Sequence, residues 1–148
     1  MKNMMDAYMS VLPTELVIAC VFGLFYIVIA LLAKMAVGNR GIWLCLAVCV
    51  PLLTASCIYK LSGLGVRAPS AGARMFYLSI VGLAIVGIPL WYTARALLWL
   101  DRSAPRLGAI TQGAAAWAIG MATTPLAVTA VFAIDAVASN FGFGGFAR

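Results

Sequence analysis

Residues 14–37 read TELVIACVFGLFYIVIALLAKMAV, and this stretch decides the fold class of the chain. Between Glu15 and Lys34 it carries no charged side chain. A helix of about 20 apolar residues spans the roughly 30 Å hydrocarbon core of a bilayer, so the stretch predicts a membrane-spanning helix. Because the run is too long for a signal peptide and no small-residue cleavage site follows it, we expect the helix to be retained.

Three further apolar runs follow, at residues 41–64, 75–100 and 109–138. Each is long enough to cross a bilayer once and too short to cross it twice. Backbone groups in lipid must be paired within the segment, so these runs are expected to be helices. The short connections between runs favour antiparallel neighbours. We therefore predict an all-α integral membrane protein of one domain, with four transmembrane helices in an up-down bundle and a tail at residues 139–148.

The composition excludes a water-soluble globule. Of the 148 residues, 9% are charged and 65% are hydrophobic, and the mean hydropathy is +1.07, whereas a soluble domain carries about 25% charged residues. The net charge of +6 comes from basic residues that are spread singly along the chain. We therefore expect contact with the lipid bilayer and none with nucleic acid.

The basic residues divide equally between the two predicted sides of the membrane. Lys2, Lys60, Arg67, Arg74 and Arg148 lie on the side of the N-terminus, and Lys34, Arg40, Arg95, Arg102 and Arg106 lie on the other. The positive-inside rule therefore gives no orientation. Either a partner complex sets the topology or the chain inserts both ways. The expected location is the cell (inner) membrane.

The residue types that usually carry catalysis are scarce. There is no histidine, which removes the commonest general base and the usual ligand of b-type haem. The four cysteines lie inside apolar runs without a Cys-x-x-Cys pair, so we expect them to pack as small apolar residues. We expect no enzymatic activity, no metal site and no cofactor.

Ionisable residues in or beside the apolar runs are candidates for ion pairing or transport: Glu15, Lys60, Arg95 and Asp135. We expect Thr14 to cap the first helix and Glu15 to open it. Asp135 is expected near the membrane interface, paired with Lys60 or with one of two arginines, Arg67 and Arg74. Arg95 stands among Trp91, Tyr92 and Trp99, which predicts an interfacial anchor or a cation–π contact.

Small residues recur every three or four positions in the fourth run. One row consists of Gly113, Ala116, Gly120 and Thr124, and a second row consists of Ala114, Ala118 and Ala122. Small residues at this spacing let membrane helices approach closely, so we predict that this helix is the main association surface. Three prolines, Pro51, Pro89 and Pro125, lie near the middle of runs two to four and are expected to bend them, either for shape alone or as hinges.

Two functions remain after these exclusions. The leading hypothesis is a non-catalytic structural or accessory subunit of a larger membrane protein complex, whose partners are other membrane subunits or copies of the same chain. The alternative is a small oligomeric transporter or channel, supported by the three prolines, the balanced charge and Asp135.

Overall fold

The computed structural model describes residues 2–143, and this part of the chain is helical with short connections. The elements are α1 (Lys2–Val37), α2 (Asn39–Leu61), the 3-10 turn η1 (Ser62–Leu64), α3 (Ala71–Ser103), α4 (Ala109–Ala122) and α5 (Thr124–Ser139). No β-strand occurs within these residues. Four stretches are long and apolar enough to cross a membrane: α1 from Tyr8, α2, α3, and α4 together with α5. The predicted helical class is confirmed, and the helices are consistent with a multi-pass integral membrane protein.

Helix α1 begins well before the predicted start near Thr14. It runs from Lys2 and contains Pro13, so Thr14 is not an N-cap and Glu15 lies within the helix rather than opening it. The early turns pack on α5: the rings of Tyr8 and Phe132 are 6.0 Å apart, and the Tyr8 hydroxyl donates to a backbone carbonyl of α5 at 3.3 Å. Threonine is a favoured N-cap residue, but α1 continues through Thr14 and its earlier turns pack on α5.

The fourth apolar run is divided into two helices. Helix α4 ends at Ala122, and α5 begins at Thr124 with Pro125 in its first turn. The Thr123 backbone N–H and hydroxyl both donate to the Gly120 carbonyl, at 3.1 and 2.7 Å, while Pro125 has no N–H to continue the ladder. Pro51 and Pro89, in contrast, lie inside helices that continue past them. Of the three expected proline bends, the one at Pro125 coincides with a break in the helix.

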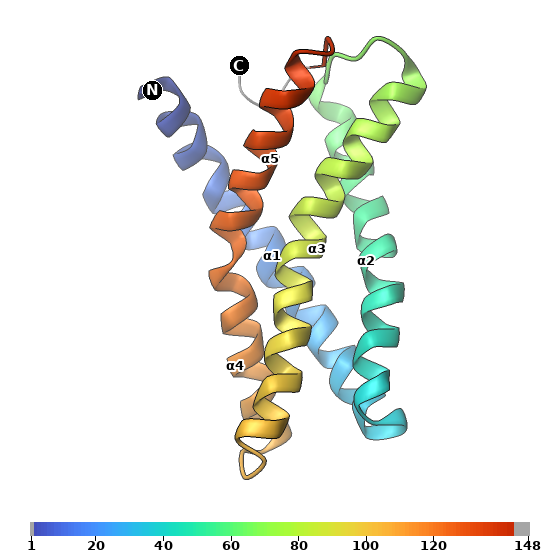
Figure 1. The fold of residues 1–148 in the computed structure, drawn as a ribbon, viewed down its shortest axis with the longest axis vertical. Coiled ribbons are helices and arrows are strands. Elements are labelled where there is room, and N and C mark those ends of the chain that lie inside the picture. The colour runs from blue at the N-terminus through green and yellow to red at the C-terminus, as the bar shows by residue number, and fades with distance from the viewer. Residues whose placement is uncertain (1, 144–148) are drawn as a thin grey trace.

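Helix α3 lies at the centre of the bundle and packs against α1, α2, α4 and α5 (Figure 1). It contributes the largest set of buried side chains, with Leu78, Val81, Leu90 and Leu97 among the most enclosed. Helix α1 crosses the others obliquely and is the least buried span, with 28% of its apolar window inside the molecule. Figure 1 shows the N-terminus, the α2–α3 connection and the end of α5 at one end of the molecule and the other two connections at the opposite end.

Candidate functional site

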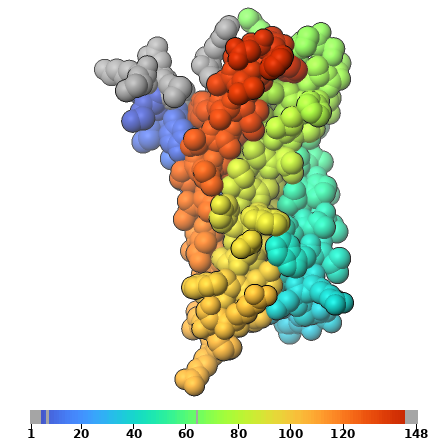
Figure 2. Space-filling view, viewed as in Figure 1, coloured from blue at the N-terminus to red at the C-terminus, as the bar shows by residue number. Residues whose placement is uncertain are grey.

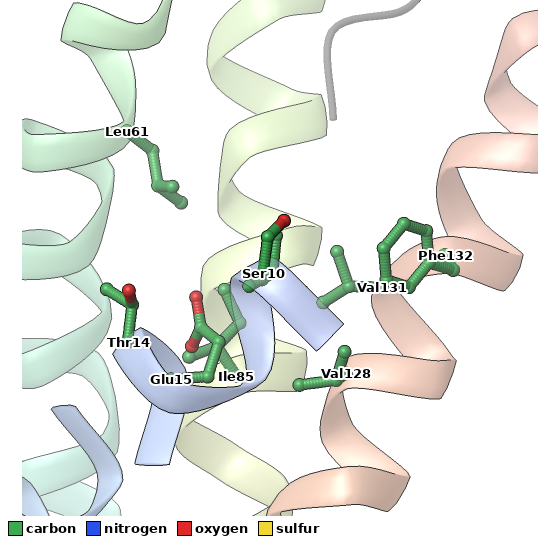
Figure 3. Close-up of a pocket in the computed structure, with 9 residues that line it drawn as sticks. Ser10, Thr14, Glu15, Leu61, Ile85, Val128, Val131 and Phe132 are labelled. Atoms are coloured by element: carbon green, nitrogen blue, oxygen red, sulfur yellow. The ribbon is translucent and has the colours of Figure 1, made fainter. Parts of the chain in front are cut away.

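A pocket of about 210 Å³ lies between four helices at the end of the molecule that holds the N-terminus (Figure 3). Helix α1 contributes the three polar side chains of Ser10, Thr14 and Glu15. The remaining lining is apolar: Val11 from α1, Leu61 from α2, Ile85 from α3, and Val128, Val131 and Phe132 from α5. The pocket therefore combines one carboxylate and two hydroxyls from one helix with hydrocarbon walls from its neighbours.

Glu15 is the ionisable residue of this pocket. Figure 3 shows its carboxyl group between Thr14 and Ile85, inside the ring of lining side chains. Within residues 2–143 the carboxylate accepts no hydrogen bond and forms no ion pair. Glu15 lies about 11 Å along the helix from the middle of the span Tyr8–Val37, and half of a bilayer's hydrocarbon core is about 15 Å thick. If α1 is centred in a bilayer, this carboxylate lies within hydrocarbon depth.

Asp135 is one helical turn beyond the pocket, about 6 Å from Val131 along α5. Its side chain is 4% exposed and accepts a hydrogen bond from the Tyr77 hydroxyl at 2.5 Å. The three bases proposed as partners do not reach it: Lys60 and Arg67 are exposed, and the Arg74 guanidinium donates to the Ser62 carbonyl. Charge alone predicted a basic partner for Asp135. A tyrosine hydroxyl can also satisfy a buried carboxylate, because it donates a hydrogen bond.

A polar cluster at the opposite end of the molecule was not predicted from the sequence. The Lys34 ammonium lies 2.5 Å from Oδ1 of Asp101 and 3.5 Å from Oε1 of Gln112. The Gln112 amide in turn donates to the Ala104 carbonyl at 3.1 Å. The cluster joins α1, α3 and the start of α4 near the ends of their apolar runs. The sequence did contain a signal for this cluster. Lys34 and Asp101 lie at the ends of two apolar runs, and these ends were predicted to lie on the same side of the membrane.

The two remaining basic candidates lie on the surface. Arg95 and Lys60 are both exposed. The indole rings of Trp91 and Trp43 pack on each other with centroids 5.2 Å apart, and Arg95 makes no cation–π contact in the part of the chain that is described. Arg95 therefore lies beside an aromatic pair rather than over an aromatic face.

The first row of small residues lies inside the chain. Gly113, Ala116, Gly120 and Thr124 are buried. A Cβ atom on Gly120 would lie 1.8 Å from Oγ1 of Thr93 on α3, and one on Gly113 would lie 2.9 Å from a methyl group of Leu31 on α1. This row packs α4 against its own neighbours, so it is not available to a partner. The second row, Ala114, Ala118 and Ala122, is the one that remains exposed.

The four cysteines are free thiols, two of them buried and two half-buried. Among the residues that the structure describes, no group of three or more His, Cys, Asp or Glu side chains is arranged to hold a metal ion. Comparisons of the chain with protein-family models, curated proteins and solved structures find no match. The function must therefore be argued from the chemistry of the Glu15 pocket.

Proposed function

We propose that the protein is a small transporter of the cell membrane that binds a compact cation, or a proton in its place, at Glu15. In this proposal the four spans cross the bilayer in up-down order and the chain works as an oligomer. The observation that carries the proposal is the Glu15 carboxylate, which has no hydrogen-bond or ion-pair partner within residues 2–143 and lies in a mostly apolar pocket between helices. An ionisable residue inside a membrane span is costly and marks an ion or substrate path by default.

The physical chemistry of the pocket favours a positively charged occupant. An unpaired carboxylate in apolar surroundings must either take up a proton or acquire a positive partner. Because these alternatives compete for one group, binding of a cation releases a proton, which is the elementary step of exchange. The Ser10 and Thr14 side chains supply further oxygen atoms on the same helix. The volume of about 210 Å³ is below that of sites for drug-sized molecules, about 300–1,000 Å³, so a compact cation fits best.

A second candidate function is the accessory subunit favoured by the sequence. It is supported by the exposed row Ala114, Ala118 and Ala122 on α4, because small residues on an outward face permit close approach of another membrane helix. Neither candidate assigns a catalytic step to the chain.

Proton flux in vesicles tests the transport proposal. The purified protein is placed in vesicles with an acidic, pyranine-containing lumen, and tetramethylammonium is added outside because it has no proton to lose. We expect the wild type to raise the pH of the lumen faster than empty vesicles do. Glu15→Gln, which keeps the shape of the side chain, should abolish the difference. Asp6→Asn serves as the control, since Asp6 is an exposed acid of the same helix outside the pocket.

Two results would contradict the proposal. One is a wild-type rate equal to that of empty vesicles over a panel of compact quaternary ammonium ions. The other is a Glu15→Gln rate equal to that of the wild type, which would show flux that does not depend on this carboxylate.

A further inference from the structure

An open hollow of about 900 Å³ lies at the α2–α3 connection. Its polar lining comes from Ser62, Arg67, Ser70 and Arg74, and Met75 and Gly142 also line it. The connection lies between two candidate spans, Asn39–Leu61 and Ala71–Ser103. In a membrane-inserted chain this position is at the level of the lipid headgroups.

The electrostatics of the hollow favour an anion. No acidic side chain occurs among its described lining residues. Arg67 is exposed and makes no hydrogen bond or ion pair within residues 2–143. Arg74 is half-buried. One of its amino groups donates to the Ser62 carbonyl, while its buried Nε has no hydrogen-bond partner among the described residues. Two guanidinium groups at a hollow whose described lining carries no acidic side chain are suited to a phosphate group, which accepts several charge-assisted hydrogen bonds.

An apolar groove of about 530 Å³ lies between α3 and α5. Phe76 and Ile80 line it from α3, and Ala133, Phe141 and Phe143 line it from α5 and the residues that follow. Lining residues of the two cavities are neighbours in the sequence at two places. Met75 lines the hollow and Phe76 lines the groove, and Gly142 lines the hollow while Phe141 and Phe143 line the groove. Helices α3 and α5 lie side by side in Figure 2.

We propose that the hollow and the groove together bind one anionic phospholipid. The phosphate lies between Arg67 and Arg74, and an acyl chain follows the groove along α3 and α5. A basic hollow alone would suit any phosphate, but the hydrocarbon groove selects an amphipathic anion. Basic pockets at helix ends are a recurrent means of recognising anionic headgroups. This inference is independent of the Glu15 pocket, which has a separate lining.

Lipid binding to the purified chain tests the inference. The delipidated protein in detergent micelles is titrated with phosphatidylglycerol and with phosphatidylcholine, and bound lipid is counted by native mass spectrometry. We expect phosphatidylglycerol to bind the wild type preferentially. Arg67→Gln should weaken its binding about fivefold, the effect of losing one basic residue near an anionic lipid. The matched control, Arg106→Gln, removes an exposed arginine at the opposite end of the molecule and should leave binding unchanged.

A second variant tests the groove. Ala133 is exposed and lines the groove, so Ala133→Trp should block the acyl chain and weaken phosphatidylglycerol binding while both arginines remain. Equal binding of the two lipids, or equal loss in Arg67→Gln and Arg106→Gln, would overturn the proposal. Displacement of the lipid by inorganic phosphate at equal concentration would also overturn it, because the ligand would then be the free anion.

Discussion

Gly120 on α4 lies so close to α3 that a side chain larger than hydrogen does not fit. Its missing Cβ position is 1.8 Å from Oγ1 of Thr93 and 3.0 Å from the Pro89 carbonyl oxygen. The Thr93 side chain is fully buried and donates to that same carbonyl at 2.8 Å, so it has little freedom to move away. The glycine therefore permits the close approach of α4 to α3 at this position.

Gly120→Ala is therefore expected to destabilise the chain despite the better helix propensity of alanine. Overpacking of a close contact costs about 1–3 kcal/mol, against a gain of about 1 kcal/mol in propensity. Gly120→Leu should prevent correct folding rather than only association. Thermal unfolding in micelles measures both effects, and the double variant Gly120→Ala/Thr93→Ala should recover part of the loss.

Ile29→Leu on α1 is a volume-conserving control for this series and should unfold like the wild type. An unfolding temperature for Gly120→Ala at or above that of the wild type would show that α4 and α3 are farther apart than the structure places them.

The Tyr77–Asp135 pair makes a second prediction at the scale of residues. Tyr77→Phe removes the donor and leaves a buried carboxylate without this hydrogen bond, which should cost about 1–3 kcal/mol. Asp135→Asn keeps an acceptor oxygen for the Tyr77 hydroxyl, so its cost should be smaller, below about 1 kcal/mol. Unfolding of the two variants under the same conditions checks the order, and the reverse order would indicate that Asp135 has an ionic partner after all.

At the scale of helices, the Lys34–Asp101–Gln112 cluster holds α1, α3 and α4 together at one end. A double-mutant cycle with Lys34→Met and Asp101→Asn should give a coupling energy of about 1 kcal/mol. The side chains are 19% and 30% exposed, so the coupling should decrease as salt is added. Independent, additive effects of the two substitutions would contradict the ion pair.

The helices were largely predictable because each apolar run has the length that a bilayer requires. The ends of the helices were harder to predict. Helix α1 extends to Lys2, and its early turns are held by the contact of Tyr8 with Phe132 of α5. A contact between residues so far apart in the sequence leaves no local signal. The break near Pro125 could be anticipated from the missing N–H, but the same argument gave equal weight to Pro51 and Pro89, whose helices continue.

The candidate site was predictable only in its parts. Glu15 was identified as an ionisable residue of an apolar run, but the early start of α1 changes its position from the helix end to the helix interior. Nothing in the sequence distinguishes the apolar residues of the other three helices that line its pocket from other apolar residues. In the same way, spacing alone identified two rows of small residues on the fourth run but not which row faces α3, since that depends on the rotation of α4 about its axis.

The exposed row of α4, Ala114, Ala118 and Ala122, offers a way to distinguish effects on folding from effects on association. Ala118→Leu places a bulky group on an exposed position, so the isolated chain should unfold like the wild type. If helices of a partner or of a second copy approach this row closely, the same variant should lower the yield of the assembled form on native gels. Unchanged assembly in Ala118→Leu would remove the support that this row gives to the accessory-subunit hypothesis.

In the transport proposal the Glu15 carboxyl group lies in a mostly apolar pocket and is open to a cation. Dicyclohexylcarbodiimide, which forms a stable N-acylurea with carboxyl groups that are shielded from water, tests this claim directly in membranes that contain the protein. We expect peptide mass spectrometry to find the label on Glu15 and not on the exposed Asp6, and we expect tetramethylammonium to slow the labelling. Labelling of Asp6 instead, or labelling of Glu15 at a rate that no compact ammonium ion changes, would contradict this claim.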